Sequence, residues 1–158
     1  MQFEKAVQTL CDAGVDFVII GGVSATLHGS AAVTYDLDIC YSRSSANLER
    51  LAASLAPFRP RPREFPEGVP FLWDARTLRN VAILTLQTEL GEIDLIAEVA
   101  GVGGFDEVKA HSISVEAFGR ELATLDLPAL IRAKRAAGRP KDLASVAELE
   151  SLLEAGEP

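Results

Sequence analysis

The chain has 158 residues, a hydrophobic fraction of 48% and a charged fraction of 24%, a composition that predicts one folded domain and excludes a disordered or collagen-like chain. Its 15 basic and 23 acidic side chains give a net charge of −8, which excludes non-specific coating of nucleic acid or of an anionic membrane. No apolar run reaches the ~18 residues of a membrane span, and Met1–Lys5 lacks the features of a signal peptide. Because Cys11 and Cys40 form neither a disulfide framework nor a zinc pattern, a cytoplasmic protein with reduced thiols is expected.

Hydrophobic periodicity predicts the elements in chain order. The first half should form a helix over 3–13, a strand over 16–20, a short helix over 24–28, a strand over 34–41, a helix over 45–56 and an edge strand over 69–73. The second half should form strands over 81–88, 93–99, 112–115 and 120–125, then helices over 127–137 and 140–153. Residues 59–70 and 101–104, rich in proline or glycine, should be loops. This order predicts an α/β (α+β) fold with a mixed β-sheet, helices packed mainly on one face and two C-terminal helices.

The run Asp36-Leu37-Asp38 carries the first candidate site. On a strand, residues i and i+2 face the same side, so the two carboxylates lie together while Leu37 faces the core. A hard divalent cation such as Mg²⁺ relieves the repulsion between them. Asp94, flanked by apolar residues in a later strand, repeats the pattern, and three carboxylates on adjacent strands can hold two metal ions for attack on phosphorus. Taken alone, each motif is also compatible with a solvated strand face.

Gly21-Gly22 directly follows the first buried strand. Glycine lets the backbone approach a ligand closely, and free N–H groups at the start of a helix attract phosphate, to which Ser24 could add a hydroxyl. The run is neither a Walker A loop nor a GxGxxG fingerprint, and a tight turn is the alternative interpretation.

The combined order of motifs is more specific than any one of them. It reads Ile20-Gly21-Gly22, a spacer over 23–35, Asp36-Leu37-Asp38-Ile39, and later Ile93-Asp94-Leu95. This pattern resembles the DNA polymerase β-like nucleotidyltransferase superfamily. The bacterial branch that includes the AbiEii-type toxin nucleotidyltransferases is similar in further features, namely Gly29, Thr34, Leu130-Ile131-x-x-Lys134 and Arg139-x-Lys141-Asp142. The resemblance implies one nucleotidyltransferase-like domain over 1–158, with a catalytic core over about 4–125 and C-terminal helices over about 126–154.

That resemblance implies an enzyme that moves a nucleoside monophosphate from an NTP to an acceptor hydroxyl with the help of two Mg²⁺ or Mn²⁺ ions. The residues it implies are Asp36, Asp38 and Asp94 for the metal ions, Gly21, Gly22 and Ser24 for the phosphates, and Lys134 for charge neutralisation. Arg139 and Lys141 belong to a basic cluster over 132–141 that we expect to bind the triphosphate or an RNA acceptor; a solvated helix end is the alternative.

The sequence departs from the family pattern at Ala32, where many members carry an arginine. A non-catalytic relative that binds nucleotide or a partner protein is therefore the alternative function, and a metal-dependent phosphohydrolase is a third. The acceptor, whether an RNA end such as that of tRNA, a protein or a small molecule, is not specified by any residue, nor is the NTP. The branch implies a toxin-like role, with an antitoxin or a second copy of the chain as candidate partner and no membrane.

Two further groups of residues carry weaker indications. Arg59, Arg61 and Arg63 alternate with prolines and form either a substrate-facing loop or a merely solvated one. His28 and Cys40 border the predicted site, but no base accompanies the thiol, and a local hydrogen bond is the simpler expectation for the imidazole.

Overall fold

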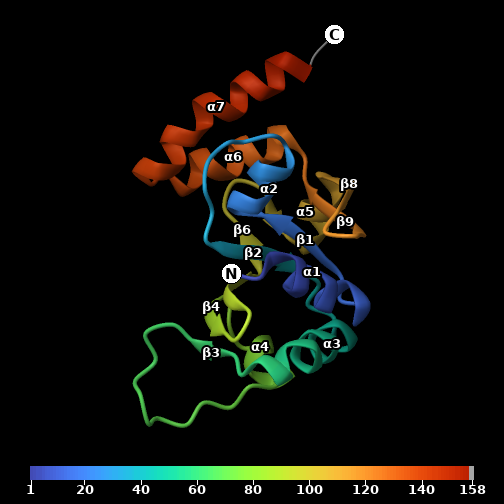
Figure 1. Cartoon of the computed structure of the whole chain (residues 1–158), viewed down its shortest axis with the longest axis vertical. Coiled ribbons are helices and arrows are strands. Elements are labelled where there is room, and N and C mark those ends of the chain that lie inside the picture. Colours follow the sequence, from blue (N-terminus) through green and yellow to red (C-terminus); the bar gives the residue numbers. More distant parts are fainter. Residues whose placement is uncertain (157–158) are drawn as a thin grey trace.

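A seven-stranded mixed sheet forms the centre of the structure, a computed structural model that describes residues 1–156 (Figure 1). In spatial order its strands are β3 (Arg61–Pro62), β4 (Ile83–Thr88), β5 (Gly91–Ile96), β2 (Asp36–Tyr41), β1 (Phe17–Ile20), β9 (Arg120–Leu125) and β8 (Ser112–Ala117). A separate ribbon pairs β6 (Glu98–Val99) with β7 (Gly103–Gly104). The helices are α1 (Phe3–Asp12), α2 (Gly21–Leu27), α3 (Ser45–Leu55), the 3₁₀ turn η1 (Ala56–Phe58), α4 (Ala75–Arg79), α5 (Phe105–Ala110), α6 (Leu127–Ala137) and α7 (Pro140–Gly156).

The middle of the sheet combines parallel and antiparallel pairs. Strand β1 is antiparallel to β2 and parallel to β9, whereas β5 is parallel to β2 and antiparallel to β4. The β2–β5 register sets Asp38 opposite Asp94 and Asp36 opposite Glu92. Because alternate residues of a strand share a face, these four carboxylates lie on the same face of the sheet.

Two hydrophobic cores cover the two faces of the sheet. Helices α1, α3 and α4 pack on the face that carries Leu37, Ile39 and Ile93, each of them fully buried. Helices α2, α5, α6 and α7 pack on the opposite face, largely over β1 and β9, together with Val18 and Cys40. Complete burial of one such aliphatic side chain contributes about 1.5–3 kcal/mol, so the alternation in β2 fixes which face the carboxylates take. The predicted mixed α/β fold class is confirmed. The expectation that the helices pack mainly on one face is wrong, because central strands such as β1 are buried throughout and need cover on both faces.

Two segments fold differently from the sequence prediction. Residues 69–73 form no strand, because Trp73 turns inward and donates from Nε1 to the Ala52 carbonyl oxygen at 2.7 Å, while Leu72 is exposed. The edge strand is instead β3, inside the segment expected to be a loop, and the chain then runs away from the sheet before it returns at α4 (Figure 1). The second difference is the β6–β7 ribbon and α5, a six-residue helix with only Val108 buried, which is too short to show apolar periodicity.

The two C-terminal helices are placed by local signals that are visible in the sequence. Asp126 caps α6 by accepting from the Ala129 N–H at 2.8 Å, and Gly138, with φ of +67°, ends that helix in the left-handed conformation. Helix α7 follows at once and lies beside α6 (Figure 1). Among the described residues, no helix combines the length and the apolar character needed to cross a bilayer.

Candidate active site

Three carboxylates from two strands meet on the face of the sheet that carries the second core. Asp36 and Asp38 come from β2 and Asp94 comes from β5, and one oxygen of each lies within 4.8 Å of the others. All three side chains are half-buried, so they are shielded from solvent without being enclosed. The sequence predicted this convergence, and it follows from the parallel β2–β5 register.

The electrostatics of this cluster are unfavourable without a cation. Burial, with the neighbouring charges of Asp36 and Asp94, raises the pKa of Asp38 to about 8. Burial also raises the pKa of Asp94, although the hydrogen bond from Asp38 and the charge of Arg63 act in the opposite direction. Oδ1 of Asp38 is a buried oxygen without a hydrogen-bond partner among the described residues. A hard divalent ion would satisfy this oxygen and remove the repulsion, so the residues present fit a Mg²⁺ or Mn²⁺ site.

The predicted glycine corner lies against the carboxylates. Gly21 has a φ of +66°, and a Cβ atom at this position would lie 2.1 Å from Oδ2 of Asp38. A Cβ atom at Gly22 would lie 2.6 Å from the hydroxyl oxygen of Thr34. Only glycine therefore lets the start of α2 approach Asp38 and Thr34 this closely.

Two cations line a cavity of about 250 Å³ together with Asp38, whereas Asp36 and Asp94 lie outside its lining. The lining also includes Gly21, but not Gly22, and the two cations are Lys134 and Arg139, with apolar side chains from β4, β5 and α6. Asp142, 1% exposed, holds both cations: Arg139 Nε donates to its carboxylate at 2.6 Å, and Lys134 Nζ lies 3.5 Å from it. Burial would raise the pKa of Asp142, but Arg139 and Lys134 lower it below its usual range.

The structure does not bring every predicted residue to this cavity. Ser24 is fully buried, and its hydroxyl oxygen accepts a hydrogen bond from Thr124 at 2.6 Å, so it takes part in the core between α2 and β9. Lys141 is exposed and lies outside the cavity lining. His28 Nε2 forms a hydrogen bond with the Leu125 carbonyl oxygen at 2.7 Å. Burial raises the pKa of the Cys40 thiol to about 12, which removes it as a nucleophile at neutral pH.

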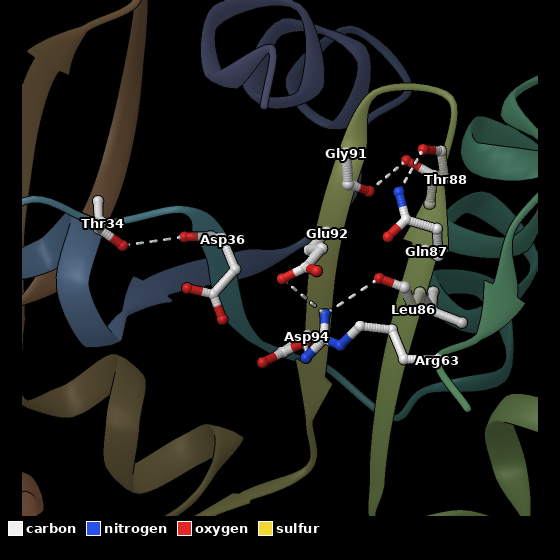
Figure 2. A network of polar contacts seen from close by, with 9 residues as sticks. All are labelled: Thr34, Asp36, Arg63, Leu86, Gln87, Thr88, Gly91, Glu92 and Asp94. Carbon is white, nitrogen blue, oxygen red and sulfur yellow. Dashed lines mark hydrogen bonds and ion pairs between the residues drawn. The ribbon is translucent and has the colours of Figure 1, made fainter.

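Three residues that the sequence did not assign also belong to the site. Asp142 is one of them; its sequence signal was only its place in the run Arg139-x-Lys141-Asp142. Glu92, opposite Asp36, was detectable from its i−2 spacing to Asp94. Arg63 had no such signal, because the contact joins a proline-rich edge segment to a strand about thirty residues later (Figure 2).

No protein-family model matches the sequence, and no curated protein matches it significantly. Two solved structures have the same fold. One is a proposed nucleotidyltransferase from Thermotoga maritima, with a TM-score of 0.60 and 13% identity over 94% of this chain and 92% of that one. The other is the lincosamide antibiotic adenylyltransferase LnuA with lincomycin bound, with a TM-score of 0.63 and 13% identity over 96% of each chain. These likenesses show that the chain shares the fold of these two proteins.

Proposed function

We propose that this protein is a metal-dependent nucleotidyltransferase, which moves a nucleoside monophosphate from an NTP to an acceptor hydroxyl and releases pyrophosphate. The observation that carries the proposal is the convergence of Asp36, Asp38 and Asp94 beside Gly21. Asp38 also shares a cavity with Lys134 and Arg139. A nucleoside triphosphate binds together with metal ions, so its site needs carboxylates to hold the ions and cations to neutralise the phosphates.

The residues have separate roles in this reaction. Asp36 and Asp38 would hold two Mg²⁺ or Mn²⁺ ions, and Asp94 would hold the one beside the acceptor. When bound, the ions supply charge neutralisation for the triphosphate and lower the pKa of the acceptor hydroxyl. The backbone N–H groups of Gly21 and Gly22, at the start of α2, would bind the phosphates, while Lys134 and Arg139 neutralise phosphate charge.

The bond changes balance without any further co-reactant. The acceptor oxygen forms a bond to the α-phosphorus, and the bond from that phosphorus to the bridging α–β oxygen breaks. Pyrophosphate leaves with the electron pair of the broken bond. Asp94 is the group beside the acceptor that takes the hydroxyl proton.

The proposal extends to the class of acceptor and to the biological role of the protein. The acceptor is an RNA end, a protein side chain or a small molecule carrying a hydroxyl. Placement in the AbiEii-type branch is supported by the runs Leu130-Ile131-x-x-Lys134 and Arg139-x-Lys141-Asp142. The branch, and no single residue, suggests a toxin role with an antitoxin or a second copy of the chain as partner.

One observation favours a non-catalytic alternative that binds nucleotide or a partner protein. Ala32 lies exposed on the loop before β2, where many relatives would carry an arginine, and its methyl group supplies no charge. The backbone of that loop is tied down instead, since the Ala31 N–H donates to Glu148 at 3.1 Å. Under this alternative, nucleotide binds without turnover.

Incubation with NTPs labelled at the α-phosphorus, Mg²⁺, and total cellular RNA, protein and metabolites tests the proposal. We expect a labelled acceptor together with pyrophosphate, and loss of both in the double variant Asp36→Asn, Asp38→Asn. Transfer that survives in the double variant would contradict the assigned site. Binding without pyrophosphate release would support the non-catalytic alternative, and free phosphate without a labelled acceptor would support a phosphohydrolase.

A further inference from the structure

Arg63 reaches the carboxylate cluster from the edge of the sheet. Its Nη2 donates to Oδ1 of Asp94 at 2.6 Å, and its Nη1 donates to the Leu86 carbonyl oxygen at 3.2 Å and lies 3.6 Å from a Glu92 oxygen (Figure 2). The side chain is 24% exposed and that of Asp94 is 14% exposed, so this ion pair is largely shielded from solvent. Such a shielded, short contact is stronger than an exposed surface pair.

The backbone of β3 fixes the start of this side chain. The Arg63 N–H donates to the Thr85 carbonyl oxygen at 2.8 Å, and Thr85 lies opposite Asp94 in the β4–β5 register. The Arg63 side chain therefore crosses β4 to reach the third strand in from the edge. Glu64, with a φ of +65°, turns the chain away immediately afterwards. The neighbouring Arg61 is used differently, because its guanidinium donates to the Val69 carbonyl oxygen at 3.1 Å.

The two oxygens of Asp94 have different surroundings. Figure 2 shows one oxygen on the side of Arg63 and the other on the side of Asp36. An oxygen of Asp94 also belongs to the group within 4.8 Å of the Asp36 and Asp38 oxygens. A metal ligand of this kind has to be held in one orientation, and hydrogen bonds from neighbouring groups commonly hold it there.

We propose that Arg63 is a positioning residue of the metal site, which holds Asp94 by its outer oxygen and so presents the inner oxygen to a divalent ion. The inference rests on the proposed function. It assigns the arginine- and proline-rich segment 59–63 a role in organising the metal site. Arg63 touches neither the nucleotide nor the reacting atoms. It acts through Asp94, while the Leu86 carbonyl oxygen and Glu92 hold the other end of the guanidinium.

A rival interpretation makes the opposite prediction. If Arg63 were only a positive charge near the cluster, its removal would strengthen the binding of any cation, because like charges repel. If Arg63 positions Asp94, its removal weakens metal binding, since the carboxylate loses the contact that fixes its orientation. The sign of the change in affinity therefore separates the two.

The test is Mn²⁺ binding to the full chain, followed by electron paramagnetic resonance without nucleotide or acceptor. We expect Arg63→Met to raise the Kd for Mn²⁺ about tenfold or more. Arg63→Lys should recover part of the affinity, because a lysine can still donate to Asp94. Arg61→Met is the matched control: it removes an arginine from the same strand without touching the cluster, and its Kd should equal that of the wild type. Arg63→Gln replaces Arg63→Met if that variant is poorly folded.

An Arg63→Met protein that binds Mn²⁺ as tightly as the wild type, or more tightly, would overturn the inference. An equal loss in Arg61→Met would also overturn it, by showing a general effect on the edge of the sheet. In either case nucleotidyl transfer by the wild type would still stand, so the inference would fail alone. A wild-type protein that binds no Mn²⁺ would overturn the proposed function and this inference together. As a second readout, excess Mn²⁺ should restore transfer in Arg63→Met, which a folding defect would not allow.

Discussion

Asp38 lies directly opposite Asp94 across the parallel pair β2–β5, and burial raises the pKa of both carboxyls. Neighbouring carboxylates in a sheet destabilise it when both are charged, and here a third, Asp36, joins them. Without metal ions the cluster therefore lowers the stability of the fold, and bound cations would remove this cost. The predictions below follow from that balance and from the residues around it.

The first prediction concerns the pH dependence of stability without divalent ions. Asp38 keeps its proton up to about pH 8 in the folded protein, against an ordinary value of 3.8, so folding favours the protonated form. Its contribution to the free energy of unfolding is complete below about pH 4 and is lost as the pH rises towards 8. The loss is about 1.4 kcal/mol for each unit by which the pKa in the folded protein exceeds that in the unfolded chain. Urea unfolding in EDTA should show this decline in the wild type.

Asp38→Asn should remove that decline, because the amide has no proton to lose in this range. Added Mg²⁺ at pH 8 should stabilise the wild type and leave the variant unchanged. Identical pH profiles for the two proteins would show that Asp38 does not carry the effect.

The second prediction concerns the buried carboxylate that holds the cations. Asp142→Asn leaves Arg139 and Lys134 without their shared acceptor, and we expect a loss of about 1–3 kcal/mol in the free energy of unfolding and a higher KM for the NTP. Glu150→Gln, at the exposed ion pair with Arg135, is the control and should cost less than about 1 kcal/mol. Equal losses in the two variants would show that the burial of Asp142 is not decisive.

The third prediction separates two effects of adding a side chain at Gly21: strain in the backbone and a steric clash with Asp38. Gly21 and Gly68 both have positive φ, +66° and +78°, so alanine at either position should cost about 1–2 kcal/mol of stability. At Gly68 no atom lies within 4 Å of the added Cβ, whereas at Gly21 it meets Asp38. Gly21→Ala should therefore also weaken Mn²⁺ binding and abolish transfer, and Gly68→Ala should do neither. Retained Mn²⁺ affinity in Gly21→Ala would contradict the placement of Asp38 in the metal site.

The fourth prediction addresses the less exposed of the two cations that line the cavity. The Lys134 side chain is 17% exposed, so Lys134→Met keeps its apolar contacts and removes its charge. We expect kcat/KM for the NTP to fall about tenfold or more, because phosphate charge is no longer neutralised. Steady-state kinetics with Lys109→Met, at an exposed position on α5, provides the comparison. An unchanged kcat/KM would remove Lys134 from the phosphate site.

Sequence reasoning predicted the elements whose signals are local. Alternation around Leu37 and Ile39 located β2 and set Asp36 and Asp38 on one face, and Asp94 followed from the same rule. The cap at Asp126 and the glycine at Gly138 located α6. In each case a strong periodicity or a specific backbone requirement left few alternatives.

Local sequence patterns did not predict which side chains from distant segments of the chain come into contact. Ser24 follows the glycines closely and could have faced a phosphate, but one helical turn points it at Thr124 in the core. Arg63 reaches Asp94 only because β3 forms the edge of the sheet beside β4, and a two-residue strand between prolines has no periodicity to reveal it. The partners of Ser24 and Arg63 depend on which elements become neighbours, which no local pattern specifies.

The most direct test of the central claim is the anomalous diffraction of crystals soaked with Mn²⁺ and a non-hydrolysable NTP analogue. We expect manganese peaks within coordinating distance of Asp36, Asp38 and Asp94, with the phosphates directed towards Lys134 and Arg139. Manganese bound elsewhere, or the triphosphate bound away from these three carboxylates, would contradict the account.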